Sequence, residues 1–168
     1  FPASLSICLS IPGYMADFDS GHLYHVGYSP GNGYKTYTFT VAYMSDSQGN
    51  VSFVVKEPET IEGISGSISA EGGKLTFDDQ ALAFELLADG QVSPVSAGWL
   101  LMKALRGGYV RSCGVKGDKI NLEIDDSYAD DALRLQIELG ENDLPEYAEI
   151  LYKDRRFLSL HVRNFQIQ

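Results

Sequence analysis

The sequence YKTYTFTVAYM at residues 34–44 alternates larger apolar side chains with threonine and alanine. Its apolar members are Tyr37, Phe39, Val41 and Tyr43. Successive side chains of a strand point to opposite faces, so this pattern predicts a β-strand with one apolar and one threonine-rich face. The turn-forming residues 45–50 and the renewed alternation of residues 51–55 extend the prediction to an antiparallel hairpin.

Short strand patterns separated by polar breaks follow this hairpin. They cover residues 74–78, 81–87, 109–115, 119–125, 132–139, 147–152 and 156–167. Pro58 marks the end or edge of the strand before it, and the Gly- and Ser-rich residues 60–73 predict one bent or bulged strand. Residues 4–11 are compatible with a further strand, and residues 12–33 are loop-rich. The whole pattern predicts a meandering antiparallel sheet.

One segment, SPVSAGWLLMKALRGG at residues 93–108, has the pattern of a helix. Pro94 stands at the first helical position after a serine, and a glycine pair ends the segment. Its apolar residues cover nearly the whole circumference, so the helix should be buried on more than one side. We therefore predict a mainly β (α+β) fold: a single curved antiparallel half-barrel sheet with a short apolar helix packed on its concave face.

Composition and charge exclude several classes of function. The 168 residues include 13 basic and 23 acidic side chains, a net charge of −10, which disfavours nucleic acid as a partner. Residues 118–154 contribute −9 of that charge, and their alternation of Leu and Ile with polar residues predicts an apolar inner and a polar outer face. No stretch of 18 apolar residues predicts a membrane span, and we expect any targeting segment to have been removed or never to have existed.

Candidate metal and catalytic residues are few. Cys8 and Cys113 allow one disulfide or two thiols, and they exclude a four-cysteine zinc site. His22 and His25 have a spacing that could hold a metal on a helix, and residues 17–21 begin like a calcium loop, but neither pattern is complete. We therefore expect no metal and no cofactor.

The acidic stretch DDSYADD at residues 125–131 could bind calcium or pair carboxylates for catalysis, but an exposed turn between two strands is favoured. The sequence contains no nucleophilic-serine or phosphate-loop motif, so we expect no enzymatic activity.

Ten tyrosines and eight phenylalanines are the remaining signal. On alternating strands they first indicate a core. A curved sheet can, however, present more apolar surface than one short helix covers, which would leave a pocket for an apolar ligand. The residues expected near such a ligand are Phe39, Val41, Tyr43, Phe53, Phe77, Phe84, Trp99 and Met102.

The order and spacing of these features resemble the LolA/LolB/RseB-like superfamily of extracytoplasmic lipoprotein-associated domains. The resemblance is carried by VSFVVKEPETIEGI at residues 51–64, the helix that begins with Ser-Pro, PEYAEI at residues 145–150 and RFLSLHVRNFQI at residues 156–167. It looks in particular like the mature part of a lipoprotein from clostridial-type Gram-positive bacteria. The resemblance covers roughly residues 35–167 and implies an apolar cavity, which in carrier members accepts lipoprotein acyl chains, and no catalysis. From the length of the chain we expect a single LolA-like domain over residues 1–168, with a loop-rich part at 1–33.

Three hypotheses of function follow. The first is a non-enzymatic, extracytoplasmic lipoprotein domain that binds an apolar ligand, a lipid or acyl chain, or a partner protein at the cell envelope. Such a domain would reach the membrane only through a lipid anchor outside this sequence. The second is a structural or assembly protein that docks another protein through its sheet and has no ligand cavity. A hydrolase built on the Asp-rich loop is a third, less favoured, hypothesis.

Overall fold

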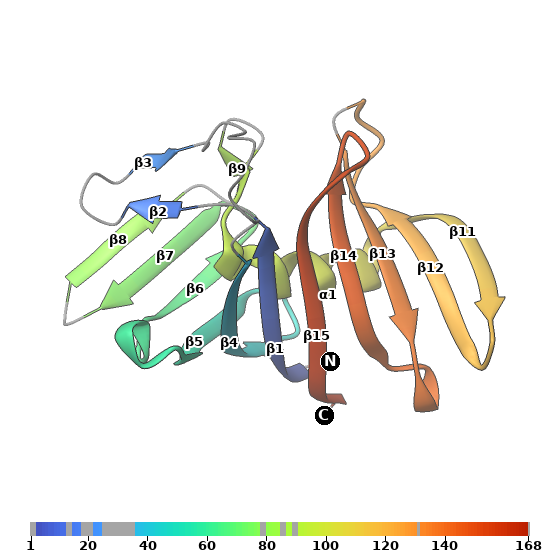
Figure 1. Ribbon diagram of the computed structural model, residues 1–168, viewed down its shortest axis with the longest axis horizontal. Coiled ribbons are helices and arrows are strands. Elements are labelled where there is room, and N and C mark those ends of the chain that lie inside the picture. The colour runs from blue at the N-terminus through green and yellow to red at the C-terminus, as the bar shows by residue number, and fades with distance from the viewer. Residues whose placement is uncertain are drawn as a thin grey trace.

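The computed structural model describes residues 3–12, 15–17, 22–24, 36–77, 80–84, 87–88, 91–130 and 132–167 (Figure 1). Within them, one antiparallel sheet of 11 strands has the order β11-β12-β13-β14-β15-β1-β4-β5-β6-β7-β8. Its strands are β1 (Ala3–Pro12), β4 (Thr36–Ser45), β5 (Val51–Glu57), β6 (Ser65–Ser69), β7 (Gly72–Phe77), β8 (Gln80–Phe84), β11 (Tyr109–Lys116), β12 (Lys119–Asp125), β13 (Leu133–Leu139), β14 (Pro145–Tyr152) and β15 (Arg155–Ile167). Two small ribbons pair β2 (Met15–Asp17) with β3 (His22–Tyr24) and β9 (Leu87–Ala88) with β10 (Gln91–Val92). The expected curved antiparallel sheet is confirmed.

Strand β1 joins two meanders into this sheet. It pairs on one side with β4, from Ala3 opposite Ser45, and on the other side with β15, from Ala3 opposite Ile167. Figure 1 shows β1 at the centre, between β4–β8 on the left and β15–β11 on the right. The strand expected at residues 4–11 is confirmed, and it lies in the middle of the sheet.

Residues 60–73 do not form the one bent strand that their composition predicts. A 3₁₀ turn, η1 (Glu59–Ile61), follows Pro58, and the chain then forms β6, a tight turn and the start of β7. Gly72 stands at that turn with φ of 139°, in a region that glycine tolerates and other residues avoid. The glycines of this stretch therefore make a hairpin rather than a bend in one strand.

The predicted helix is confirmed at residues 94–107, where η2 (Pro94–Ser96) leads into α1 (Ala97–Gly107). The Gly108 N–H bonds the Ala104 carbonyl at 2.9 Å and closes the last turn. Residues 97–102 and 104 are all buried, which fits the apolar pattern around the helix. Figure 1 shows α1 crossing the sheet near its centre. No helix in the described part of the chain is long and apolar enough to cross a membrane.

The sheet face on which α1 packs is called the inner face here. Along β13, Leu133, Leu135, Ile137 and Leu139 are buried and alternate with Arg134, Gln136 and Glu138, which are not. The predicted apolar inner face and polar outer face of residues 118–154 are thus confirmed on this strand. Residues of β4, β5, β12, β14 and β15 join the same core with α1.

Candidate functional site

A row of residues crosses the inner face from α1 toward the edge strand β8. The strand register pairs Phe53 with Gly66, Gly66 with Leu75 and Leu75 with Leu82, so these four positions share that face. Phe53 is 1% exposed but Leu82 is 66% exposed, and Phe77, on the same face of β7, is 50% exposed. Leu75, Phe77 and Leu82, here called the β8 wing, form apolar surface that α1 does not cover.

The opposite edge of the sheet shows the same change in exposure. The buried Ile124 on β12 pairs with Val110 on the edge strand β11, and Ile120 pairs with Val115. Val110 is 61% exposed and Val115 is 75% exposed. Val110, Val115 and Ile120, here called the β11 wing, extend the apolar inner face beyond the other end of α1.

Polar contacts fix α1 over the centre of the inner face. The buried Tyr43 hydroxyl donates to the Val95 carbonyl at 3.1 Å and accepts from the Gly98 N–H. Gly98 permits this approach because a Cβ there would stand 2.7 Å from the Tyr43 ring. At the other end of α1, the Arg106 guanidinium donates to the Ser45 hydroxyl at 2.9 Å. The helix therefore covers the core as a fixed element and divides the two wings.

Tyr43→Phe should destabilise the protein by on the order of 1 kcal/mol, because it leaves the Gly98 N–H and the Val95 carbonyl without their partner. Burial raises the pKa of Tyr43 above its ordinary value of 10.0, although the Gly98 hydrogen bond opposes the shift. The folded protein then holds this proton more tightly than the unfolded chain, so stability should fall above about pH 10. Urea unfolding at several pH values would measure both effects. The predicted pH dependence would be contradicted if the free energy of unfolding fell above about pH 10 as steeply in Tyr43→Phe as in the wild type.

The eight residues expected near a ligand are divided between the core and its surroundings. The buried members are Val41, Tyr43, Phe53, Trp99 and Met102, all in the core cluster with α1. Phe39 is partly buried against that cluster, Phe77 belongs to the β8 wing, and the side chain of Phe84 lies outside the described residues. The structure thus brings six of the eight together, and their contact with a ligand stays a prediction.

The space between α1 and the sheet is packed with side chains where the structure describes it. Val41 on β4 is 1% exposed, and Leu101 on the helix and Ile150 on β14 are fully buried. Two open hollows lie elsewhere: one of about 660 Å³ along the β6–β7 hairpin, and one of about 470 Å³ beside the start of β11. Apolar surface for a ligand is therefore found on the wings rather than beneath the helix.

The Asp-rich loop is held by ion pairs and backbone contacts. Asp125 lies 3.2 Å from Arg134 and 3.4 Å from Arg111. Asp126 accepts the Leu133 N–H at 2.8 Å and pairs with Lys103 on α1 at 3.3 Å. Asp126 thus closes the turn and ties it to the helix, Asp125 links β12 to β11 and β13, and Asp131 lies outside the described residues.

Calcium should leave the melting temperature unchanged, because Asp125 and Asp126 already bind cationic side chains and a backbone N–H. Thermal unfolding with added CaCl₂ and with a chelator would measure this. A calcium-dependent rise in the melting temperature, lost in the double variant Asp126→Asn and Asp130→Asn, would contradict this expectation. It would make the loop a metal site.

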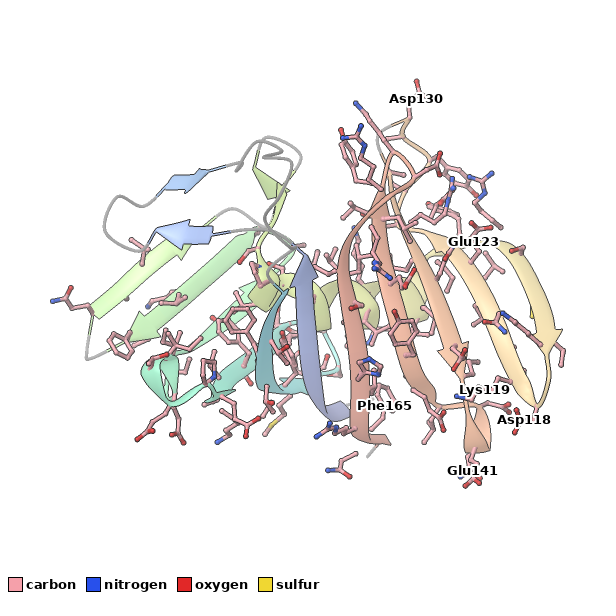
Figure 2. The ribbon with its side chains drawn as sticks, in the orientation of Figure 1. Asp118, Lys119, Glu123, Asp130, Glu141 and Phe165 are labelled. Carbon is pink, nitrogen blue, oxygen red and sulfur yellow. The ribbon has the colours of Figure 1, made fainter. Side chains whose placement is uncertain are left out.

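The outer face of strands β12–β15 carries much of the acidic charge. Arg134 contacts Glu123, Asp125 and Asp154, and hydrogen bonding to Asp125 raises its pKa. Lys119 bonds Glu138 and Glu146, and these hydrogen bonds raise the pKa of Lys119. Figure 2 shows Asp130 at one end of this half of the sheet and Asp118 and Glu141 at the other. This surface should repel anionic membranes and attract basic partners.

Among the residues whose positions the structure describes, no cluster of three or more His, Cys, Asp or Glu side chains could hold a metal ion. Cys113 on β11 is an exposed free thiol. The pair His22 and His25 and the calcium-like residues 17–21 fall wholly or partly outside the described residues, and nothing tests them.

Comparisons with known proteins give similar structures only. No protein-family model matches the chain, and neither does any curated protein sequence. A conserved protein from Thermus thermophilus matches with a TM-score of 0.47 and 8% identity over 99% of this chain and 78% of its own. A LolA superfamily protein from Nitrosomonas europaea matches with a TM-score of 0.43 and 12% identity over 98% of this chain and 86% of its own.

The lipoprotein LppX from Mycobacterium tuberculosis matches with a TM-score of 0.38 and 9% identity over 98% of this chain and 88% of its own. These similar structures thus include a member of the superfamily that the sequence motifs resemble, and a lipoprotein.

Sequence reasoning missed the functional interest of Leu82, Val110 and Val115. Each belongs to an apolar alternation that is typical of a core, and only the strand order shows that β8 and β11 stand at the two ends of the described sheet. The usable signal was the short length of the one predicted helix, which spans too little to cover so many strands.

Proposed function

We propose that this protein is a non-enzymatic binding module that holds an apolar ligand, a lipid or an acyl chain, against the β8 wing. The observation that carries the proposal is the exposure of Phe77 and Leu82 on a face whose neighbouring residues form the core. Scattered exposed apolar residues are normal, but a continuous extension of the core face costs free energy unless something covers it. Covering it with an acyl chain gains roughly 25 cal/mol per Å² of apolar area removed from water.

The cellular setting belongs to the same proposal. The motifs at residues 51–64, 145–150 and 156–167 support an extracytoplasmic lipoprotein domain that a lipid anchor outside these residues attaches to the membrane. A domain placed there meets lipids and envelope proteins. Its acidic outer face favours contact with the membrane through that anchor rather than through its own surface.

Binding of a fluorescent fatty acid tests the proposal with a matched pair of variants. Leu82→Asp puts a carboxylate on the inner face and should weaken binding at least about tenfold. Ala81→Asp, the adjacent exposed residue of β8 on the outer face, should leave binding unchanged. Both sites are exposed, so both variants should keep the wild-type melting temperature. Equal binding by wild type and Leu82→Asp would contradict the proposal.

Native mass spectrometry of the purified protein gives an independent test. Co-purified lipid that is present in wild type and Ala81→Asp but depleted in Leu82→Asp supports a lipid ligand. A protein that carries no lipid and binds no fatty acid argues against it.

The second candidate is a protein that docks a partner through a sheet edge. All eight residues of β11 are exposed, and open strand edges pair readily with other chains. This candidate predicts a protein partner that the Leu82→Asp variant still binds. The Cys113→Pro variant, which changes the edge strand β11, should not bind that partner. The fatty-acid experiment therefore separates the two functions.

A further inference from the structure

The hollow beside the start of β11 has a composition unlike that of the β8 wing. Its volume of about 470 Å³ lies within the roughly 300–1,000 Å³ of small-molecule sites. Gly108 at the end of α1, the first residues of β11, the end of β12 and the loop at 127–129 line it. Two separate stretches of the chain, residues 108–111 and 125–129, therefore meet there, in the half of the sheet opposite the β8 wing.

Two tyrosines supply the flat surfaces of this hollow. The Tyr109 and Tyr128 rings lie with their centroids 3.6 Å apart and are tilted by 37°. Tyr128 is 83% exposed and Tyr109 is 39% exposed, so the pair presents aromatic surface to solvent although it stands in the most acidic part of the chain. The negative face of an aromatic ring attracts the weakly positive C–H groups of a ligand that lies flat on it.

An ion pair supplies hydrogen-bonding groups at the same place. Arg111 Nη1 lies 3.4 Å from Asp125 Oδ2, and Arg134 Nε lies 3.2 Å from Asp125 Oδ1. A guanidinium has five N–H donors and a carboxylate has about four acceptor sites, so both groups keep capacity for a ligand. The Ser127 hydroxyl adds a donor and an acceptor. Because the charges at Arg111 and Asp125 compensate each other, a neutral ligand is favoured over an ion.

We infer that this hollow binds a neutral saccharide, with a sugar ring lying on Tyr128 and its hydroxyl groups bonding Arg111, Asp125 and Ser127. A pyranose combines a face of C–H groups with a rim of hydroxyls, which is the pairing that these side chains offer. The inference goes beyond the proposed lipid ligand and stands on different residues.

An NMR titration with cellobiose, maltose and chitobiose tests the inference on the full chain. At least one disaccharide should cause saturable shifts in the amide resonances of residues 108–111 and 125–129. Tyr128→Ala should weaken that binding about tenfold or more, whereas Tyr128→Phe, which keeps the ring, should retain most of it. Arg111→Ala should weaken it as well, and Met44→Ala, an exposed residue of the other half, should have no effect.

Three results would overturn the inference. The first is an absence of saturable shifts with all three disaccharides. The second is equal binding by wild type and Tyr128→Ala, with unchanged melting temperatures showing that both are folded. The third is a response to an aromatic anion such as naphthalene sulfonate without a response to any sugar. None of these readouts depends on fatty-acid binding, so failure here and failure of the proposed lipid function are distinguishable.

Discussion

Leu101→Ala is expected to lower the free energy of unfolding by about 2–5 kcal/mol, because it opens a cavity where α1 meets the sheet. Leu101 is fully buried in the middle of the helix, and the core cluster around it draws on both halves of the sheet. The neighbouring side chains cannot move far into this cavity, because Tyr43 and Arg106 hold the helix at both ends. Urea unfolding at neutral pH measures the change.

Leu101→Met is the matched control, since it conserves volume and should cost less than about 1.5 kcal/mol. A loss for Leu101→Ala no larger than that of Leu101→Met would mean that α1 does not pack on the core as described.

Gly66→Ala is expected to cost at least the roughly 1–3 kcal/mol of an overpacked core. A Cβ at Gly66 on β6 would meet the Lys74 carbonyl oxygen of the neighbouring strand and stand 2.7 Å from Cζ of Phe53. The carbonyl belongs to the sheet backbone and cannot rotate away, and Phe53 is itself 1% exposed. Strands β6 and β7 would have to separate, which would also disturb the β8 wing beyond them.

Gly107→Ala serves as the control for this variant. It lies at the end of α1, where an added methyl group would have no atom within 4 Å, so it should be neutral or slightly stabilising. Thermal and urea unfolding of both variants would compare them. Equal stability of Gly66→Ala and Gly107→Ala would contradict the close approach at Gly66.

The sequence predicts those parts of the fold that depend on local periodicity. The alternation of Leu133 to Leu139 predicts which face of β13 is buried, and the Ser-Pro start and glycine stop predict the helix. The tight turn at Gly72 was missed, because a glycine serves equally in a bend or in a hairpin. The central position of β1 was missed for another reason: pairing between residues far apart in sequence leaves no periodic signal within either strand.

The candidate sites were also predictable only in those features that depend on local sequence. An apolar face larger than one helix can cover was predictable from the number of aromatic residues and the short helix. Which apolar residues stay exposed depends on strand order, so Leu82 could not be distinguished from Phe53 in advance. The pairing of Tyr109 with Tyr128 depends on the path of the Asp-rich loop, which composition alone does not determine.

The position of β1 between the two meanders also sets the order in which the protein can fold. Each meander pairs neighbouring strands and can form early, but β1 must pair with β15, so Ala3 must meet Ile167 from the far end of the described chain. That contact closes a very long loop, whose entropic cost slows folding. Of the described strands, the ribosome makes β15 last, so β1 would keep one open edge until synthesis reaches β15. Throughout that time this strand would be open to pairing with another chain, which exposes the protein to aggregation during biosynthesis.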